Sequence, residues 1–312
     1  MAIESFGDLL AAARANGPQT VVAAGAQQGS VLEALASAET LGIARAILIG
    51  DEPEIRSTAA TRNVDLTAME VIHEPDIELA VRKAMTQVAN GRAQVAMKGD
   101  VDTATFLRAA LDRELGLRTG TLLSHVAVFD MRSLGRLLLI SDAGVNIAPT
   151  LAQKADIVRN AIRVAHQLGI DLPRVAVLAS TETVNPKIPA NVEAAALAKM
   201  ADRRQITGAL VDGPLALDNA ISPHAARNKD ITSQVAGRAD ILILPDIEAG
   251  NVLVKAIVYF VQQPMAGVVV GAKVPLILPS RSDTYESKLD SVALGVVMVS
   301  SVGRQQGSSN GG

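Results

Sequence analysis

Short apolar runs recur along the chain and alternate with stretches of helical periodicity. The runs, rich in Val, Ile and Leu, occupy residues 20–24, 46–49, 94–97, 137–140, 174–178, 208–211, 241–244 and 274–278. Most are nearly continuous in apolar character, which is typical of strands buried on both faces of a parallel sheet. The segments 30–41 and 155–168 carry a helical pattern and are each followed by glycine, and Ser30 with Glu33 predicts a capping box. This alternation predicts an α/β fold.

The length and composition of the chain limit what it can be. Its 312 residues predict two domains or one large α/β domain. The net charge of −3 gives no reason to expect nucleic acid or an anionic membrane as a partner. The absence of cysteine excludes disulfides, thiolate nucleophiles and zinc–thiolate sites. No apolar run reaches the ~18 residues needed to span a bilayer, and the N-terminal segment does not resemble a signal peptide, so we expect a cytoplasmic protein.

Turn-forming residues at 143–150 suggest a domain boundary. We place residues 1–142 and 284–312 in a first α/β domain and residues 143–283 in a second. The helical pattern over 283–301 is expected to return to the first domain. Residues 303–312 are rich in Gly, Ser and Gln and are predicted to form a disordered tail.

The segment 274–283 combines an apolar run, a sharp turn and the start of an amphipathic helix. The turn places Ser280 and Arg281 at the carboxyl end of a predicted strand, where ligands bind in open α/β sheets. The N-terminus of the following helix adds unpaired N–H groups. The two side chains are therefore suited to hold an anion or a developing oxyanion. Alternatively, Ser280 only begins the turn and Arg281 is a solvated surface charge.

A second candidate segment begins at Lys98, after another predicted strand. Gly99 lets a ligand approach the backbone, and Thr103 offers a hydroxyl group. Arg108 lies further along the next predicted helix, and Thr and Arg side chains suit a phosphate ligand. The alternative is that Asp102 or Thr103 caps this helix and that Arg108 is solvated.

Acidic residues follow two further predicted strands. Asp212 comes after the first, and Asp246, Glu248 and Asn251 come after the second. Such carboxylates could bind a divalent metal or orient a ligand. They could equally cap the helices that follow. Two acidic strand ends in successive βα units make a cleft more plausible than one alone.

Taken in order, these segments resemble the phosphate acetyltransferase and phosphate butyryltransferase family, and its butyryl-type branch more closely. The resemblance extends from about residue 21 to residue 299. It is carried by segments 22–25, 31–35, 41–51, 98–108, 141–149, 212–215 and 245–251 and by the Ser280–Arg281 pair. Each segment alone is modest, but the ordered set is specific.

The resemblance implies an enzyme that transfers a short-chain acyl group reversibly between coenzyme A and inorganic phosphate. Its implied partners are acyl-CoA, phosphate and acyl phosphate, with coenzyme A as a substrate and with no metal or tightly bound cofactor. The implied fold has two doubly wound α/β domains, as in isocitrate and isopropylmalate dehydrogenases, with the active site in the cleft between them. A homodimer or higher homo-oligomer is expected. Transfer is expected to be direct, by attack of the coenzyme A thiol on the acyl phosphate in a ternary complex.

The resemblance, together with the needs of this chemistry, also assigns roles to residues. Ser280 is expected to serve the oxyanion or the sulfur, and Arg281 with Arg108 the phosphoryl or carbonyl oxygens. The expected substrate-binding residues are Lys98, Gly99, Thr103, Arg108, Asp212, Asp246, Glu248 and Asn251.

One position departs from the acetyl-type pattern. A catalytic aspartate follows the Ser-Arg pair by seven residues in acetyl-type members, and this chain has Ser287 there. Asp283 is the nearest carboxylate and the candidate third catalytic residue. With Glu286, however, Asp283 also makes a capping box, which we favour. Phosphate or water could take the thiol proton instead.

Two other functions remain open from the sequence. A metal- and nicotinamide-dependent dehydrogenase of a related two-domain fold could use Asp212, Asp218 and Asp246 as a divalent site. The turn at 25–30 lacks the G-x-G-x-x-G spacing, which argues against nicotinamide binding. A non-catalytic coenzyme A-binding protein is the other alternative. Some butyryl-type relatives are labelled with acyl-CoA hydration, but no residue here specifically supports that chemistry.

Overall fold

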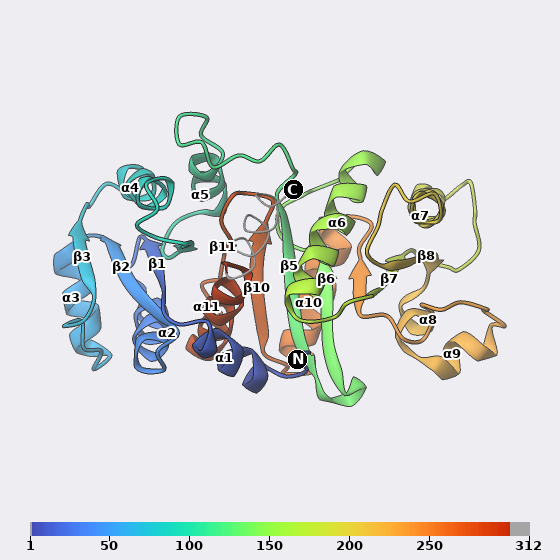
Figure 1. Cartoon of the computed structure of the whole chain (residues 1–312), viewed down its shortest axis with the longest axis horizontal. Coiled ribbons are helices and arrows are strands. Elements are labelled where there is room, and N and C mark those ends of the chain that lie inside the picture. The colour runs from blue at the N-terminus through green and yellow to red at the C-terminus, as the bar shows by residue number, and fades with distance from the viewer. Residues whose placement is uncertain (1, 300–312) are drawn as a thin grey trace, which may run out of the picture. The chain divides into compact units, whose positions relative to one another are not determined.

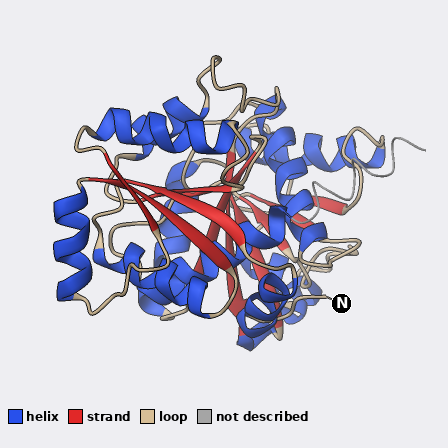
Figure 2. Cartoon of the chain, turned by 60° about the vertical axis from the view of Figure 1, so that its left-hand side comes forward, coloured by secondary structure: helices blue, strands red, loops and turns tan. Residues whose placement is uncertain are grey.

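The computed structural model of the chain describes residues 2–299 (Figure 1). The predicted tail at 303–312 therefore lies outside the described residues. The chain divides into two compact units. Unit 1 comprises Met1–Ser5 and Leu122–Pro264, and unit 2 comprises Phe6–Thr121 and Met265–Gly312. Each unit contains both helices and strands, which Figure 2 distinguishes by colour.

Unit 2 is built on a mostly parallel sheet in the order β3-β2-β1-β4-β11-β10. Only the β10–β11 pair among these is antiparallel. The strands are β1 (Gln19–Ala24), β2 (Ala44–Gly50), β3 (Glu70–His73), β4 (Val95–Lys98), β10 (Met265–Val270) and β11 (Leu276–Ile277). The helices are α1 (Phe6–Ala15), α2 (Gly29–Thr40), α3 (Glu52–Thr61), α4 (Ile77–Ala89), α5 (Thr103–Ala110) and α11 (Tyr285–Val299). Helix α11 packs against α1 and α2, and α4 packs against α5.

Unit 1 has a sheet in the order β5-β6-β9-β7-β8. The strands are β5 (Ser124–Met131), β6 (Arg136–Ser141), β7 (Arg174–Leu178), β8 (Leu210–Leu215) and β9 (Ile241–Ile243). β5 and β6 form an antiparallel hairpin around a 3-10 turn (Arg132–Leu134), and the other pairs are parallel. The helices are α6 (Leu151–Gln167), α7 (Pro189–Asp202), α8 (Leu217–Ile221), α9 (Pro223–Asn228) and α10 (Ile247–Phe260).

The predicted α/β class is confirmed, and the near-continuous apolar runs correspond to buried strands. In β1, for example, the residues from Val21 to Ala24 are all fully buried. The sheets are not wholly parallel, because the hairpin and the β10–β11 pair run antiparallel. No helix in the described part of the chain is both long and apolar enough to cross a membrane.

The units differ in extent from the predicted domains. The expected boundaries followed residues 142 and 283, whereas the units divide after Thr121 and Pro264. The hairpin accounts for the first difference, because β6 pairs with β9 and thereby draws residues 122–142 into unit 1. Pairing of β11 with β4 accounts for the second, because it draws residues 265–283 into unit 2.

Most helices begin directly after a residue whose side chain caps the helix N-terminus. Asp51, Asp76 and Asp102 each accept backbone N–H groups at the start of α3, α4 and α5. Thr150 and Gln153 form a full capping box at α6. The capping box predicted at Ser30 is wrong. Helix α2 begins at Gly29, and its N-cap residue Gln28 makes no side-chain cap.

Candidate functional site

Two loops of unit 2 lie side by side because the strands that precede them are neighbours. β4 and β11 are parallel, with Ile277 opposite Met97, so their carboxyl ends face the same way. The loop after β4 carries Asp100, and the turn after β11 carries Arg281. Nε of Arg281 lies 3.1 Å from Oδ1 of Asp100, which joins the two loops by an ion pair. The structure therefore brings the Lys98–Gly99 segment together with the Ser-Arg pair.

A third loop, between β1 and α2, packs against the same place. Asp100 N donates to Gly25 O at 2.7 Å, and Gln28 Nε2 donates to Arg281 O at 3.2 Å. A Cβ atom on Gly99 would lie 2.1 Å from Gly25 O, so only glycine fits there. Gly25 itself has a φ of +65°, a left-handed conformation that glycine tolerates best. The sequence interpretation of 25–30 as a tight turn did not foresee these contacts.

The turn that carries Ser280 is closed by Asp283. Ser280 N donates to Asp283 Oδ2 at 2.7 Å, and Asp283 N donates to Ser280 O at 3.2 Å. The Ser280 side chain remains exposed, with its hydroxyl 3.0 Å from that of Ser282. An exposed hydroxyl on a fixed turn is available to a ligand.

The predicted capping role of Asp283 is wrong. Thr284 Oγ1 accepts the N–H of Ser287 at 3.2 Å, so Thr284 caps α11. The carboxylate of Asp283 is instead held by Ser280 N within the turn. Ser287, at the position of the acetyl-type aspartate, lies in the first turn of α11.

Two buried lysines lie beneath these loops. Lys98 is only 5% exposed, and its Nζ donates to the carbonyls of Gly99 at 3.3 Å and Val101 at 3.1 Å. Burial lowers the pKa of Lys98, and the charge of Arg281 lowers it further. Lys288 is fully buried, and burial likewise lowers its pKa, with the carboxylate of Asp283 opposing the shift and the charge of Lys98 adding to it.

Sequence reasoning missed Lys288. A signal was available, because Lys288 lies four residues before Val292 on the face of α11 that otherwise carries buried apolar side chains. A lysine at such a position must place its ammonium against acceptors. That makes it a candidate for a role in the adjoining turn.

Helix α5 begins directly after the Lys98 loop. Asp102 accepts Thr105 N at 2.8 Å, so the alternative reading in which Asp102 caps the helix is confirmed. Hydrogen bonds from the side chain of Thr105 and, to a lesser extent, from its backbone N–H lower the pKa of Asp102. Thr103 is the first residue of α5, and exposed Arg108 lies in the last turn of this helix. Arg108 lines a cavity of about 540 Å³ between α4, α5 and the residues that follow, together with Arg82, Arg113 and Arg118.

Most of the predicted binding residues of unit 1 make hydrogen bonds within that unit. Asp212 accepts the N–H of Gly213 at 2.8 Å and the hydroxyl of Ser233. Asp246 caps α10, as the alternative reading expected. Asn251 Nδ2 lies 3.5 Å from Ala143 O, and Glu248 is exposed in the first turn of α10. Over residues 2–299, no group of three or more His, Asp or Glu residues could hold a metal ion.

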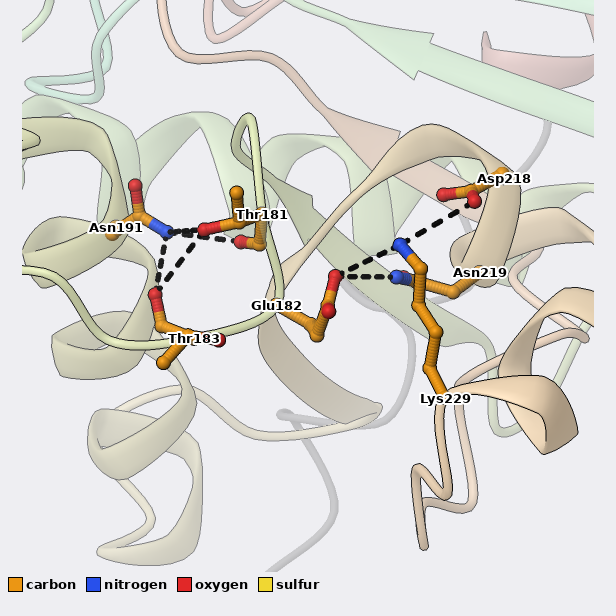
Figure 3. A network of polar contacts seen from close by, with 7 residues as sticks. All are labelled: Thr181, Glu182, Thr183, Asn191, Asp218, Asn219 and Lys229. Carbon is orange, nitrogen blue, oxygen red and sulfur yellow. Dashed lines mark hydrogen bonds and ion pairs between the residues drawn. The ribbon is translucent and has the colours of Figure 1, made fainter.

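A polar network fixes the loop that follows β7 in unit 1 (Figure 3). Glu182 accepts from Asn219 at 3.1 Å and from Lys229 at 3.0 Å. Lys229 Nζ also lies 3.4 Å from Asp218 Oδ2. Asp218 is the remaining residue of the three aspartates that the sequence offered as a metal site for a dehydrogenase. On the other side of the loop, buried Asn191 donates to the carbonyl of Thr181 at 2.9 Å. The sequence analysis did not single out this network.

A family model described as phosphate acetyl/butaryl transferase matches residues 73–296. The chain belongs to this family. The resemblance expected from the sequence is therefore confirmed. The phosphate butyryltransferase of Clostridium acetobutylicum is 45% identical to this transferase over 95% of the chain and 98% of the relative. The phosphate acetyltransferase of Thermotoga maritima is 43% identical over 93% of the chain and 98% of the relative.

Solved structures agree with this family. A branched-chain phosphotransacylase from Enterococcus faecalis matches with a TM-score of 0.79 and 34% identity, covering 90% of this transferase and 99% of that chain. A 4-hydroxythreonine-4-phosphate dehydrogenase from Klebsiella pneumoniae matches with a TM-score of 0.57 and 13% identity, covering 91% of this transferase and 98% of that chain. At that identity the second match shows a likeness of fold alone.

Proposed function

We propose that this chain transfers a short-chain acyl group reversibly between coenzyme A and inorganic phosphate. The observation that carries the proposal is the joining of the Ser280 turn to the Lys98 loop in a member of this family. The exposed side chains of Ser280 and Arg281 lie in this turn, close to two buried lysines, Lys98 and Lys288. Clustered cations and hydroxyl donors suit both a phosphoryl group and a carbonyl oxyanion.

The proposed reaction is a direct displacement. The coenzyme A sulfur attacks the carbonyl carbon of the acyl phosphate, the carbon–sulfur bond forms, and the carbon–oxygen bond to phosphate breaks. The thiol proton passes to the leaving phosphate or to water. The chain has no cysteine to carry the acyl group, which favours transfer without an acyl-cysteine intermediate.

The proposed roles rest on the family resemblance and on the needs of this chemistry. We assign the Ser280 hydroxyl to the oxyanion or the sulfur, and Arg281 and Arg108 to phosphoryl or carbonyl oxygens. Asp283 serves the turn through its hydrogen bond with Ser280 N, so we place it among the residues that shape the site. The backbone at Gly99 and the side chain of Thr103 complete the proposed binding surface in unit 2, and buried Lys98 supports it through its hydrogen bonds to Gly99 O and Val101 O.

In unit 1 the proposed contributors are Asp212, Asp246, Glu248 and Asn251. Asp212, Asp246 and Asn251 already make hydrogen bonds within the unit, so their proposed contribution is to shape the loops that meet a ligand. Glu248 is exposed and can contact a ligand directly.

The proposal includes further properties that the family resemblance implies. Coenzyme A acts as a substrate, and no tightly bound cofactor is needed. The chain works as a homodimer or a higher homo-oligomer in the cytoplasm. A two-domain fold of the isocitrate dehydrogenase kind, with its cleft, stays a prediction.

The test is phosphate-dependent release of free coenzyme A from acetyl-, propionyl- and butyryl-CoA, followed with a thiol reagent in the presence of EDTA. The chain contributes no thiol background, because it has no cysteine. Turnover that requires phosphate and persists in EDTA supports acyl transfer and ranks the acyl chains. Absence of release from all three would overturn the proposal, and release without phosphate would indicate hydrolysis instead.

A further inference from the structure

Lys288 holds the turn of the proposed site from its buried side. Its side chain is fully buried at the start of α11, and its Nζ donates to Ser280 O at 3.0 Å and to Asp283 O at 2.7 Å. These two carbonyls are the first and last of the turn. An ammonium has three N–H donors, so a single side chain fixes both ends of the turn at once.

The other contacts of the turn are exposed, among them the hydrogen bond from Gln28 Nε2 to Arg281 O. The backbone and side chain of Asp283 close it at Ser280, and Arg281 reaches across to Asp100 at the surface. Both Arg281 and Asp100 are substantially exposed, so that ion pair supplies only a weak restraint. The two hydrogen bonds from Lys288 come from a fully buried side chain, and burial strengthens such bonds relative to exposed ones.

Packing of α11 does not explain why a charged side chain occupies position 288. The neighbours of Lys288 in sequence on α11, from Leu289 to Met298, are all buried, and a methionine of similar length would fill the same space without desolvating a charge. The carboxylate of Asp283 offsets part of the cost of burial, and the nearby charge of Lys98 adds repulsion to it. Because a buried ammonium at this position is unfavourable by itself, we infer that Lys288 has a function in the adjoining turn.

We propose that Lys288 is a positioning residue for acyl transfer. Through the carbonyls of Ser280 and Asp283 it sets where the Ser280 hydroxyl and the Arg281 guanidinium stand relative to the reacting carbonyl. It makes no contact with substrate. This inference rests on the acyl-transfer function proposed above and adds to it a residue that acts through the turn.

The test is the variant Lys288→Met, assayed for acyl transfer in the full chain with kcat and KM measured separately for acyl-CoA and phosphate. Displacing reacting groups by about 1 Å costs about 100-fold in rate. We therefore expect kcat to fall by about 10- to 100-fold, with each KM changed by less than about threefold. Lys288→Gln keeps an amide NH2 group as a donor near the turn and should recover part of the loss.

The matched control is Lys154→Met in unit 1. Lys154 is 5% exposed and pairs with Glu193, so the control also removes a buried ammonium from a helix, without touching the turn. It should keep kcat close to that of the wild type, and urea unfolding should report any loss of stability in each variant.

The outcomes separate the inference from the proposed function. Phosphate-dependent transfer by the wild type together with wild-type kcat in Lys288→Met would overturn the inference and leave the function standing. An inactive wild type would remove both. If Lys288→Met does not fold, Lys288→Leu replaces it, because a folded variant that also lacks an N–H donor and has unchanged kcat would equally overturn the role.

Discussion

Arg281 and Asp100 form an ion pair, with Nε and Oδ1 3.1 Å apart, between two loops of unit 2 whose intervening sequence includes residues 122–264 of unit 1. The pair is exposed, at 71% and 48% of the respective side chains. Exposed pairs contribute little to stability, typically below about 1 kcal/mol. Its significance is therefore geometric, since it directs the guanidinium of Arg281 along the loop that follows β4.

Removing this pair should separate activity from stability. In Asp100→Asn we expect the free energy of unfolding to change by less than about 1 kcal/mol, while kcat/KM for acyl transfer falls because Arg281 loses its orientation. Glu70→Gln is the control, because it breaks the Arg92–Glu70 pair, which has similar exposure in the same unit. Urea unfolding and steady-state assays measure both effects. Equal kcat/KM values in the two variants would contradict the orienting role.

Ser280→Ala should lower kcat by about 100-fold or more while leaving KM nearly unchanged. A hydroxyl that donates to a developing oxyanion acts mainly in the transition state, and the loss of one such donor costs about 100- to 1,000-fold in kcat. The variant should remain as stable as the wild type, because the side chain is exposed. Wild-type kcat in a folded Ser280→Ala protein would rule out the assigned role.

Arg108→Gln should raise the KM for phosphate or acyl phosphate with a smaller effect on the KM for coenzyme A. The reason is that Arg108 offers an exposed guanidinium in the last turn of α5, the helix that follows the Lys98 loop. Arg14→Gln, on α1, removes an exposed arginine from the same unit and should change neither constant. An effect of Arg108→Gln confined to coenzyme A would move the residue to another part of the site.

The buried lysines predict how stability varies with alkaline pH. Burial lowers the pKa of Lys98 below its ordinary value of 10.5. Between the lowered pKa and 10.5, the unfolded chain binds more protons at this group than the native chain does, so its contribution to the free energy of unfolding rises with pH. Below the lowered pKa the full cost of burying the ammonium is present.

The measurement is urea unfolding of the wild type and Lys98→Met from about pH 8 to 10.5, because subtracting the variant cancels groups that titrate alike in both. The wild type should gain stability relative to the variant as pH rises. A relative loss over the same range would show that the hydrogen bonds from Nζ outweigh the effect of burial.

Periodicity identified most of the fold, and its failures have physical causes. The missed strand β3 is a short peripheral strand whose residues are none of them fully buried, and β10 contains a glycine that interrupts its apolar run. The hairpin strand β5 begins with Ser124 and His125 and ends with Asp130 and Met131, so its apolar centre is short. Missing β5 also displaced the predicted boundary, because residues 122–142 were assigned without the pairing that holds them.

The sequence predicted the parts of the candidate site that follow the ends of strands. It did not predict the parts that depend on contacts between loops. Ser280 and Lys98 follow predicted strands, and parallel pairing then places their loops side by side. No local pattern shows that Lys288 reaches back to the turn, or that Thr284 rather than Asp283 caps α11. These two contacts depend on the path of the backbone over several residues. The spacing of hydrophobic residues does not report that path.

The close approach of Gly99 to Gly25 has a consequence for motion. Because Asp100 is hydrogen-bonded to Gly25 O, and Gln28 to Arg281 O, none of the three loops can lift away without breaking a contact to another. They should therefore open as one cooperative unit, so that a ligand bound to one loop slows amide hydrogen exchange in all three.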